Sequence, residues 1–230
     1  MQFMSTGLAY LLAGVAFVGS WLVKRYLKST YKKWSRVENQ YRVTGAQTAA
    51  AILEDHGIKG VQLQQVRGKL TDHYDPSKDI LRLSQQNWGK TSVSAMAVSA
   101  HEAGHALQDF SNDFRLRLRK FLVPLAALGA RFGPLAVIAG FVTGNQTILQ
   151  VGAILLFGMT IFQIATLPVE FNASKRALES LERLGLSDPE QRDGVEAVLR
   201  AAALTYVAAA ATSLAYFAVL FARGRGRWIV

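Results

Sequence analysis

Long apolar stretches without charged side chains alternate with charged, polar segments along this chain. Gly7 to Val23 carries no charge, and neither do Ile148 to Val169 and Ala201 to Ala222. Each stretch is close to the roughly 20 residues that a helix needs to cross the hydrocarbon core of a bilayer. Phe121 to Thr143 has a similar length but carries Arg131 near its middle, where a charge is unfavourable. The pattern predicts a mainly α-helical, multi-span membrane protein with about four transmembrane helices.

The basic residues indicate which side of the membrane the polar segments occupy. Most of the 26 lysines and arginines lie between Lys24 and Lys120 or in the segment that follows Val169. Because cytoplasmic loops are enriched in Lys and Arg, we expect both segments to face the cytoplasm and the N-terminus to lie outside. Basic residues follow the first apolar stretch rather than precede it, which indicates a retained anchor and not a cleaved signal peptide. Four spans place the arginines of the tail outside, against the same rule: Arg223, Arg225 and Arg227.

The net charge of +10 does not by itself indicate a nucleic-acid-binding protein. The charge is concentrated beside apolar stretches, at Lys24 to Arg36 and Arg115 to Lys120, where anionic lipid headgroups are the natural partner. Aromatic residues are not interleaved with it as a stacking platform, so we expect the lipid bilayer as a partner and no nucleic acid. The chain has no cysteine, which excludes disulfides, thiolate metal ligands and a thiol nucleophile.

The segment after the first apolar stretch has the pattern of a small α+β structure. Gly45 to His56 shows helical periodicity and is followed by a glycine that can end the helix. A turn is expected from Tyr74 to Lys78, and the next helix has Thr91 or Ser92 as its N-cap. Three short strands are predicted between these helices: Val61–Val66, Leu70–His73 and Ile80–Ser84.

The residues from 101 to 105 read His-Glu-Ala-Gly-His within this second helix. On a helix, His101 and His105 lie one turn apart on one face, so both imidazoles can reach a single metal ion. Glu102 projects beside that face, where it can take a proton from the water that the metal activates. This is the H-E-x-x-H arrangement of zinc hydrolases, and it predicts one Zn²⁺ per chain as the cofactor.

A catalytic zinc ion takes three protein ligands and one open position, so a third ligand must come from elsewhere in the chain. The metzincin spacing is excluded, because its downstream Gly and third His are absent. Asp109 lies one turn after His105, but helix geometry carries it away from the ion, and we expect it to pair with a basic residue such as Arg115. Glu170 is the other candidate. On spacing alone, a ligand and a helix-start carboxylate favoured by the helix dipole are equally supported.

Four stretches of the chain, taken together, resemble the YugP-like membrane zinc metallopeptidases, in an order that covers nearly the whole chain: Leu70–Pro76, Leu81–Ser84, Val98–Gln108 and Leu167–Ser174. The stretch that begins at Glu170 is also similar to the Glu-x-x-Ala-Asp element of the HtpX-like and CAAX-prenyl membrane proteases, whose Glu is the third zinc ligand. The resemblance implies a gluzincin-like site with His101, His105 and Glu170 as ligands and Glu102 as general base.

The chain departs from that element at one position, because Ser174 stands where those relatives carry Asp. The Asp of the relatives supports a ligand from outside the metal's own shell, and such support affects metal affinity and activity. What orients His101 and His105 here is therefore open between Asn172, Ser174 and a backbone carbonyl. Two further residues before the motif, His73 and Tyr74, either contact the substrate or the transition state or lie in a solvated turn.

These observations predict a membrane-embedded zinc metalloendopeptidase that cleaves membrane or membrane-proximal polypeptides, in a bacterial cytoplasmic membrane with its site facing the cytoplasm. A catalytically inactive membrane scaffold or adaptor that retains the protease fold is the alternative. An intramembrane-cleaving metalloprotease is disfavoured, because Lys90 and the polar face from Ser92 to Ser99 do not suit a helix buried in lipid. Whether the chain forms a homo-oligomer or binds a regulatory membrane partner stays open.

The expected domain order places the protease chemistry in two separate segments. We predict a small α+β zincin-like metalloprotease segment with the sheet and the motif helix, and a second cytoplasm-facing helix that carries the third ligand. The five parts are a first transmembrane anchor at 1–23, the metalloprotease segment at 24–120, a transmembrane hairpin at 121–169, the cytoplasm-facing helix at 170–196, and the last transmembrane helix with its basic tail at 197–230.

Overall fold

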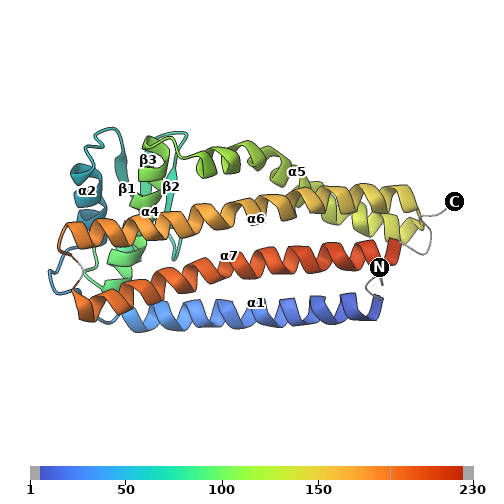
Figure 1. The fold of residues 1–230 in the computed structure, drawn as a ribbon, viewed down its shortest axis with the longest axis horizontal. Helices are drawn as coiled ribbons and strands as arrows, with labels where there is room; N and C mark the ends of the chain where they lie inside the picture. Colours follow the sequence, from blue (N-terminus) through green and yellow to red (C-terminus); the bar gives the residue numbers. More distant parts are fainter. Residues whose placement is uncertain (1–5, 187, 225–230) are drawn as a thin grey trace. The chain divides into compact units, whose positions relative to one another are not determined.

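The computed structural model describes residues 6–186 and 188–224, and it is mainly helical with one small sheet (Figure 1). Its contacts divide the chain into two compact units. Unit 1 comprises the chain up to Lys24, Arg117–Leu167 and the chain from Leu204 onward, and unit 2 comprises Arg25–Leu116 and Pro168–Ala203. The four long helices contribute residues to both units: α1 (Thr6–Trp34), α5 (Phe114–Thr143), α6 (Gln146–Arg183) and α7 (Pro189–Gly224).

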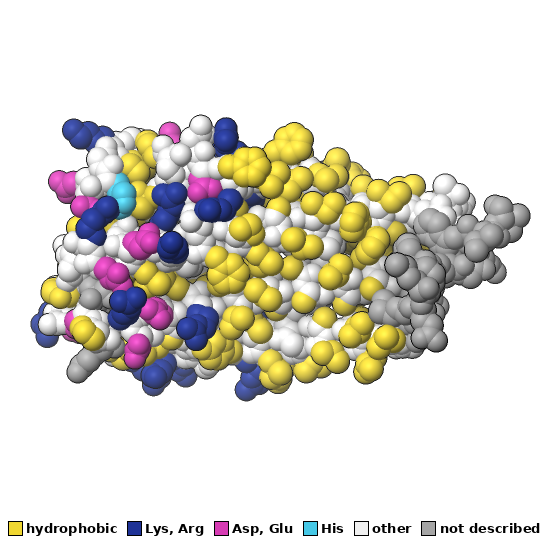
Figure 2. All heavy atoms as spheres, in the orientation of Figure 1, with side chains coloured by type: hydrophobic (Ala, Val, Ile, Leu, Met, Phe, Trp, Pro, Cys, Tyr) yellow, Lys and Arg dark blue, Asp and Glu magenta, His cyan; other side chains and the backbone are white. Residues whose placement is uncertain are grey.

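The four long helices are long and apolar enough to cross a membrane, as the pattern of the sequence predicts. On the face drawn in Figure 2, most of the coloured side chains over the helices of unit 1 are apolar, whereas charged side chains gather over unit 2. Phe121 and Val142 of α5, for example, are 79% and 81% exposed. An apolar surface of this kind suits contact with lipid rather than with water. Arg131 of α5 is also exposed, and its guanidinium carbon lies 5.2 Å from the ring centre of Phe132.

Within unit 1, α5 and α6 pack closely because glycines line their contact. A Cβ atom added to Gly129 would lie 2.4 Å from the backbone oxygen of Leu155, and one added to Gly140 would lie 2.6 Å from the backbone nitrogen of Leu149. Small residues of this kind let two backbones approach within a bilayer, where van der Waals packing replaces the hydrophobic driving force.

The sheet of unit 2 has the order β1-β3-β2, with β1 (Gln62–Val66) parallel and β2 (His73–Asp75) antiparallel to β3 (Ile80–Ser84). The strand predicted at Leu70–His73 is wrong, since β2 begins at His73 and includes residues expected in the turn. Leu70 has a positive φ of 55°, which a strand does not allow, and the Thr71 hydroxyl donates to the carbonyl of Arg67.

Three helices complete the core of unit 2. The helix predicted at Gly45 to His56 is α2 (Gly45–Asp55), which starts with a capping box between Thr44 and Gln47. A short α3 (Gln85–Trp88) leads to α4 (Val93–Phe110), whose N-cap is Ser92, one of the two predicted caps. Residues of α2, α4 and the sheet share one apolar core with the end of α6 and the start of α7, and the fully buried side chains include Ile52, Leu81, Leu83, Met96, Leu181 and Val195.

The end of α6 reaches this core as part of one continuous helix. Pro168 lies inside α6 and does not begin a new helix. Val169, Ala173, Ala177 and Leu181 are fully buried, which gives the last turns of α6 an apolar face at helical spacing. Because Glu170 follows Val169 directly, it is carried into the core of unit 2 with this face.

Candidate metal centre

The two motif histidines lie on α4, a helix that is buried along most of its length. The Ser92 hydroxyl accepts a hydrogen bond from the backbone nitrogen of Ala95, which fixes where the helix begins. His101 and His105 lie one turn apart, and their ring centres are 4.7 Å apart. Their side chains are only 12% and 10% exposed. The helical register thus presents two nearly enclosed imidazoles to one side of α4.

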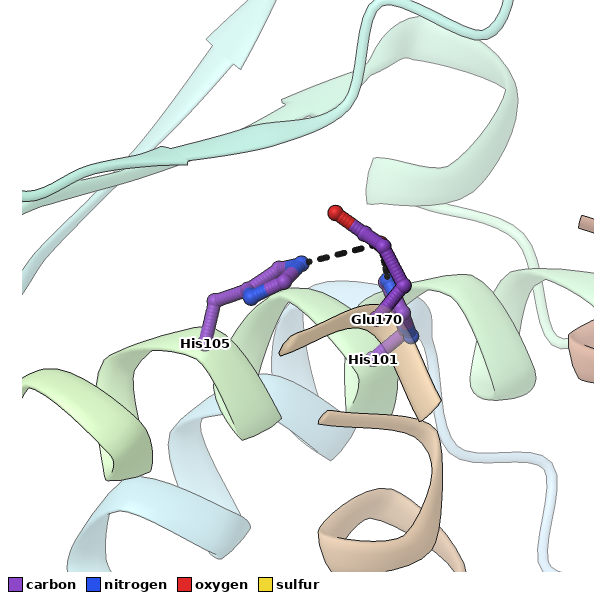
Figure 3. A group of neighbouring side chains, drawn as sticks. All are labelled: His101, His105 and Glu170. Atoms are coloured by element: carbon purple, nitrogen blue, oxygen red, sulfur yellow. Dashed lines mark hydrogen bonds and ion pairs between the residues drawn. The ribbon is translucent and has the colours of Figure 1, made fainter. Parts of the chain in front are cut away.

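Glu170 of α6 meets both imidazoles, as the resemblance implies (Figure 3). Its Oε2 atom lies 3.2 Å from Nε2 of His101 and 3.5 Å from Nε2 of His105. One ligand atom from each of the three residues lies within 4.8 Å of the others, and the carboxylate is 1% exposed. The chain therefore brings a carboxylate oxygen to two imidazole nitrogens that lie 65 or more residues earlier in the sequence.

This arrangement fits a zinc ion in both chemistry and spacing. Two imidazole nitrogens and one carboxylate form a common donor set for catalytic zinc. Ligand atoms about 2.1 Å from a tetrahedral ion lie about 3.4 Å from one another, and the two nitrogen–oxygen distances are 3.2 and 3.5 Å. The two nitrogen–oxygen distances are thus those expected of ligands that share one ion, and all three ligand atoms lie within 4.8 Å of one another.

Gly104, between the two histidines, lets α6 come this close to α4. A Cβ atom at this position would lie 2.4 Å from the backbone oxygen of Ala173. Such a contact is too short for any side chain, so α6 can cross α4 at this point only over a glycine. The close crossing in turn places Glu170, one turn before Ala173, above the imidazoles.

Each imidazole is oriented by a hydrogen bond to its second ring nitrogen. Nδ1 of His105 lies 3.0 Å from Oε1 of Gln108, and Nδ1 of His101 lies 3.2 Å from the hydroxyl of Ser174. An Nδ1–H group that donates to these oxygens would leave the lone pair of each Nε2 available to a metal ion held between the imidazoles and Glu170. Ser174 thus performs for His101 the orienting role that the sequence left open.

The residue that orients His105 was not among the candidates from the sequence. The Gln108 amide nitrogen donates to the carbonyl of Val169 at 2.8 Å and to Oδ1 of Asn172 at 3.0 Å, which leaves its oxygen for His105. Its side chain is fully buried between α4 and α6. A glutamine three residues after a histidine on one helix is the only sequence signal for this contact, and that spacing is common.

We predict that Gln108→Leu lowers zinc affinity by about 10–100-fold, because Nδ1 of His105 loses its acceptor. The measurement is competition for zinc against a chromophoric chelator. Gln86→Leu, in the short helix α3, is the matched control and should bind zinc as the unmodified chain does. Equal affinity of the Gln108 variant and the unmodified chain would contradict an orienting role.

Glu102 lies beside the cluster and contacts the sheet. Its Oε2 atom accepts a hydrogen bond from the backbone nitrogen of Tyr74, at 3.0 Å, and its side chain is buried. Burial raises the pKa of Glu102 to about 7, and the charge of Glu170 acts in the same direction while His101 opposes both. A carboxylate with a pKa near neutrality can accept a proton and release it again.

The structure places the two other site candidates differently from each other. The Tyr74 backbone contacts Glu102, but its hydroxyl shares its one proton between a carboxylate oxygen of Asp79, at 3.0 Å, and one of Asp109, at 3.2 Å. Burial and these carboxylates raise the pKa of the Tyr74 phenol. His73 lies outside the three-residue cluster: its exposed ring contacts the carbonyl of Thr71 and the guanidinium of Arg82.

Arg115, the basic residue named as an example of a partner for Asp109, has a different partner. Arg115 pairs with Asp113, at 3.2 Å, because α4 ends at Phe110 and the chain turns before α5 starts at Phe114. Asp109 contacts Tyr74 and is not part of the histidine cluster.

Comparison with known proteins bears on what this cluster does. A protein-family model described as "Putative neutral zinc metallopeptidase" matches residues 9–223. The chain belongs to this family. It is also 42% identical, over 202 residues, to "Putative membrane protease YugP" of Bacillus subtilis (strain 168), an alignment that covers 86% of this chain and 90% of that protein. No solved structure matches the chain. The family supports peptidase chemistry and zinc at the cluster of His101, His105 and Glu170.

Proposed function

We propose that this protein is a membrane-embedded zinc metalloendopeptidase that hydrolyses peptide bonds of membrane or membrane-proximal proteins. The observation that carries the proposal is the convergence of His101, His105 and Glu170 on one point beside the buried carboxylate of Glu102. The same convergence supports the description of the α4, sheet and α6 assembly as zincin-like. One zinc ion per chain would be held by the three clustered side chains.

The residues of the chain divide the reaction between them. When bound, zinc polarises the scissile carbonyl and lowers the pKa of a water molecule toward neutrality. Glu102 takes a proton from the attacking water and delivers it to the leaving amine nitrogen as the peptide bond breaks, giving a carboxylate and a free amine. The hydrogen bond from the Tyr74 backbone holds Glu102 in place for both transfers.

The edge of the sheet supports an extended polypeptide as the substrate. Among the described residues β2 pairs with β3 on one side only, and on its other side the Tyr74 backbone nitrogen donates to Glu102. The rest of this edge of β2 has no strand partner in the described part of the chain and lies next to the proposed base. A substrate strand that pairs with this edge would bring its backbone carbonyls to the site whatever its side chains.

The charge distribution supports a site that faces the cytoplasm. Basic residues follow Val23 and Val169, next to candidate spans, and the side of the membrane that is rich in Lys and Arg is usually the cytoplasmic side. In this topology the polar residues 24–120 and 170–196 lie on the cytoplasmic side, between the anchor at 1–23, the hairpin at 121–169 and the last span at 197–230. Arg225 and Arg227 of the tail lie outside the described residues.

Removal of the metal tests this function directly. We expect the purified full chain to contain about one zinc per chain and to cleave an unfolded membrane-protein substrate, with the cleavage lost after chelation and restored by Zn²⁺ but not by Mg²⁺. Elemental analysis and a gel-based cleavage assay measure the two quantities. Cleavage that persists after all metal has been removed would exclude the proposal.

A further inference from the structure

Unit 1 contains a groove of about 880 Å³ that the peptidase chemistry does not use. All four long helices contribute to its walls, and every residue that lines it belongs to unit 1. α6 and α7 are in contact at Phe157 and Phe217, whose ring centres are 4.6 Å apart. α1 and α7 are joined by a hydrogen bond of 2.7 Å between the Ser20 and Thr212 hydroxyls. The volume lies within the range of roughly 300–1,000 Å³ typical of small-molecule sites.

The lining of the groove is polar at one end and apolar at the other. Lys24, Gln163 and Thr205 lie where α1, α6 and α7 pass from unit 1 into unit 2. The lining residues further from this end, on all four helices, are mostly apolar: Tyr10, Phe17, Phe141, Leu156, Val219 and Leu220. This order matches an amphiphile that lies along the helices with its polar head at Lys24.

The charged and polar groups at this end indicate what the head contains. Lys24 is exposed and forms no ion pair among the residues that the structure describes. The amide oxygen of Gln163 is enclosed and has no hydrogen-bond partner within the described chain. Gln163 is one of the residues that line the groove. A head with an anionic phosphate for Lys24 and a hydroxyl donor for Gln163 would satisfy both groups.

The length of the groove matches one leaflet of a bilayer. From Thr205 to Leu220 the lining of α7 extends for about 22 Å, which is half of the roughly 40–45 Å thickness of a bilayer with its headgroups. A lipid of one leaflet has this length, and the lysine at the end of the groove suits its headgroup.

We infer that the groove binds one anionic phospholipid with a hydroxyl-bearing headgroup, its phosphate on Lys24 and its acyl chains between α1 and α5. The site is separate from the metal cluster, and the inference stands whether or not the chain is a peptidase. Retention of a lipid would add contacts among the four helices that line the groove in unit 1.

Native mass spectrometry of the full chain tests this inference, after reconstitution in bilayers with equal phosphatidylglycerol and phosphatidylcholine. We expect one phosphatidylglycerol to stay bound as the surrounding lipid is stripped. Lys24→Gln should reduce its preference over phosphatidylcholine by about fivefold, the effect of one basic side chain at a membrane surface. Lys28→Gln, on the same helix but outside the groove, is the matched control and should leave the preference unchanged.

A second pair of variants tests the groove itself. Ala209→Phe fills the groove and should remove the retained lipid, whereas Val207→Phe, at an exposed position of α7 that does not line it, should not. Equal retention of both lipids, or equal effects of the Lys24 and Lys28 variants, would mean that the groove holds the same lipid as the surrounding bilayer. Either result would overturn the inference. Retention of a polypeptide in place of the lipid would overturn it as well.

Discussion

Glu102→Gln is expected to reduce peptide-bond cleavage by about 10²–10⁴-fold while the zinc content stays at that of the unmodified chain. The substituted amide keeps the volume of the side chain and can still accept the hydrogen bond from the Tyr74 backbone, so the sheet and α4 should stay in place. It cannot accept a proton from water, because an amide has no basic oxygen near neutral pH. The measurement is single-turnover cleavage beside elemental analysis of the same preparation.

The same pair of measurements separates a peptidase from an inactive scaffold. Glu54→Gln is a suitable control, because Glu54 lies on the exposed side of α2 and should leave both zinc and cleavage unchanged. A scaffold that only retains the fold would bind zinc in both forms and show the same weak cleavage in both. That result would remove Glu102 as the general base and would leave the cluster as a structural metal site.

The parts of the fold that were predictable from the sequence are those set by local patterns. The apolar stretches predicted the four candidate spans, and helical spacing alone placed His101 and His105 on one face of α4. The short strand β2 was misplaced because its position depends on the left-handed backbone at Leu70 and on pairing with β3. Neither feature is written in the alternation of polar and apolar residues.

The site contained one residue that local reasoning could not find. Gln108 orients His105 only because its amide also binds the carbonyl of Val169, which α6 brings there from 61 residues away in sequence. The position of Glu170 depends in the same way on the crossing of α6 over Gly104. Spacing along the chain did not decide whether Glu170 is a ligand. The resemblance to a family implied that it is, and the packing of α6 on α4 explains how Glu170 reaches the histidines.

Glu170→Gln is expected to lower zinc affinity by more than about 100-fold, because it replaces a proposed ligand of the metal. Loss of a contact that only orients a ligand lowers the affinity by at most roughly 100-fold. Glu170 is 1% exposed, so glutamine is preferred to alanine to avoid a cavity between α4 and α6. His101→Ala, which removes another proposed ligand, should have an effect of the same order. Competition with a chelator of known affinity measures all three proteins.

The stabilisation of the fold by zinc provides an independent measurement of the same ligand. A metal that binds only the folded chain raises the free energy of unfolding by about 2.7 kcal/mol when its free concentration is 100 times its dissociation constant. This stabilisation raises the midpoint temperature of unfolding. The unmodified chain should show the rise, and so should Glu179→Gln, at an exposed position further along α6. Glu170→Gln should unfold at the same temperature with and without zinc. Full stabilisation of that variant by zinc would remove Glu170 from the ligand set and return Asp109 to consideration, although Asp109 could reach the ion only if its contact with Tyr74 were broken.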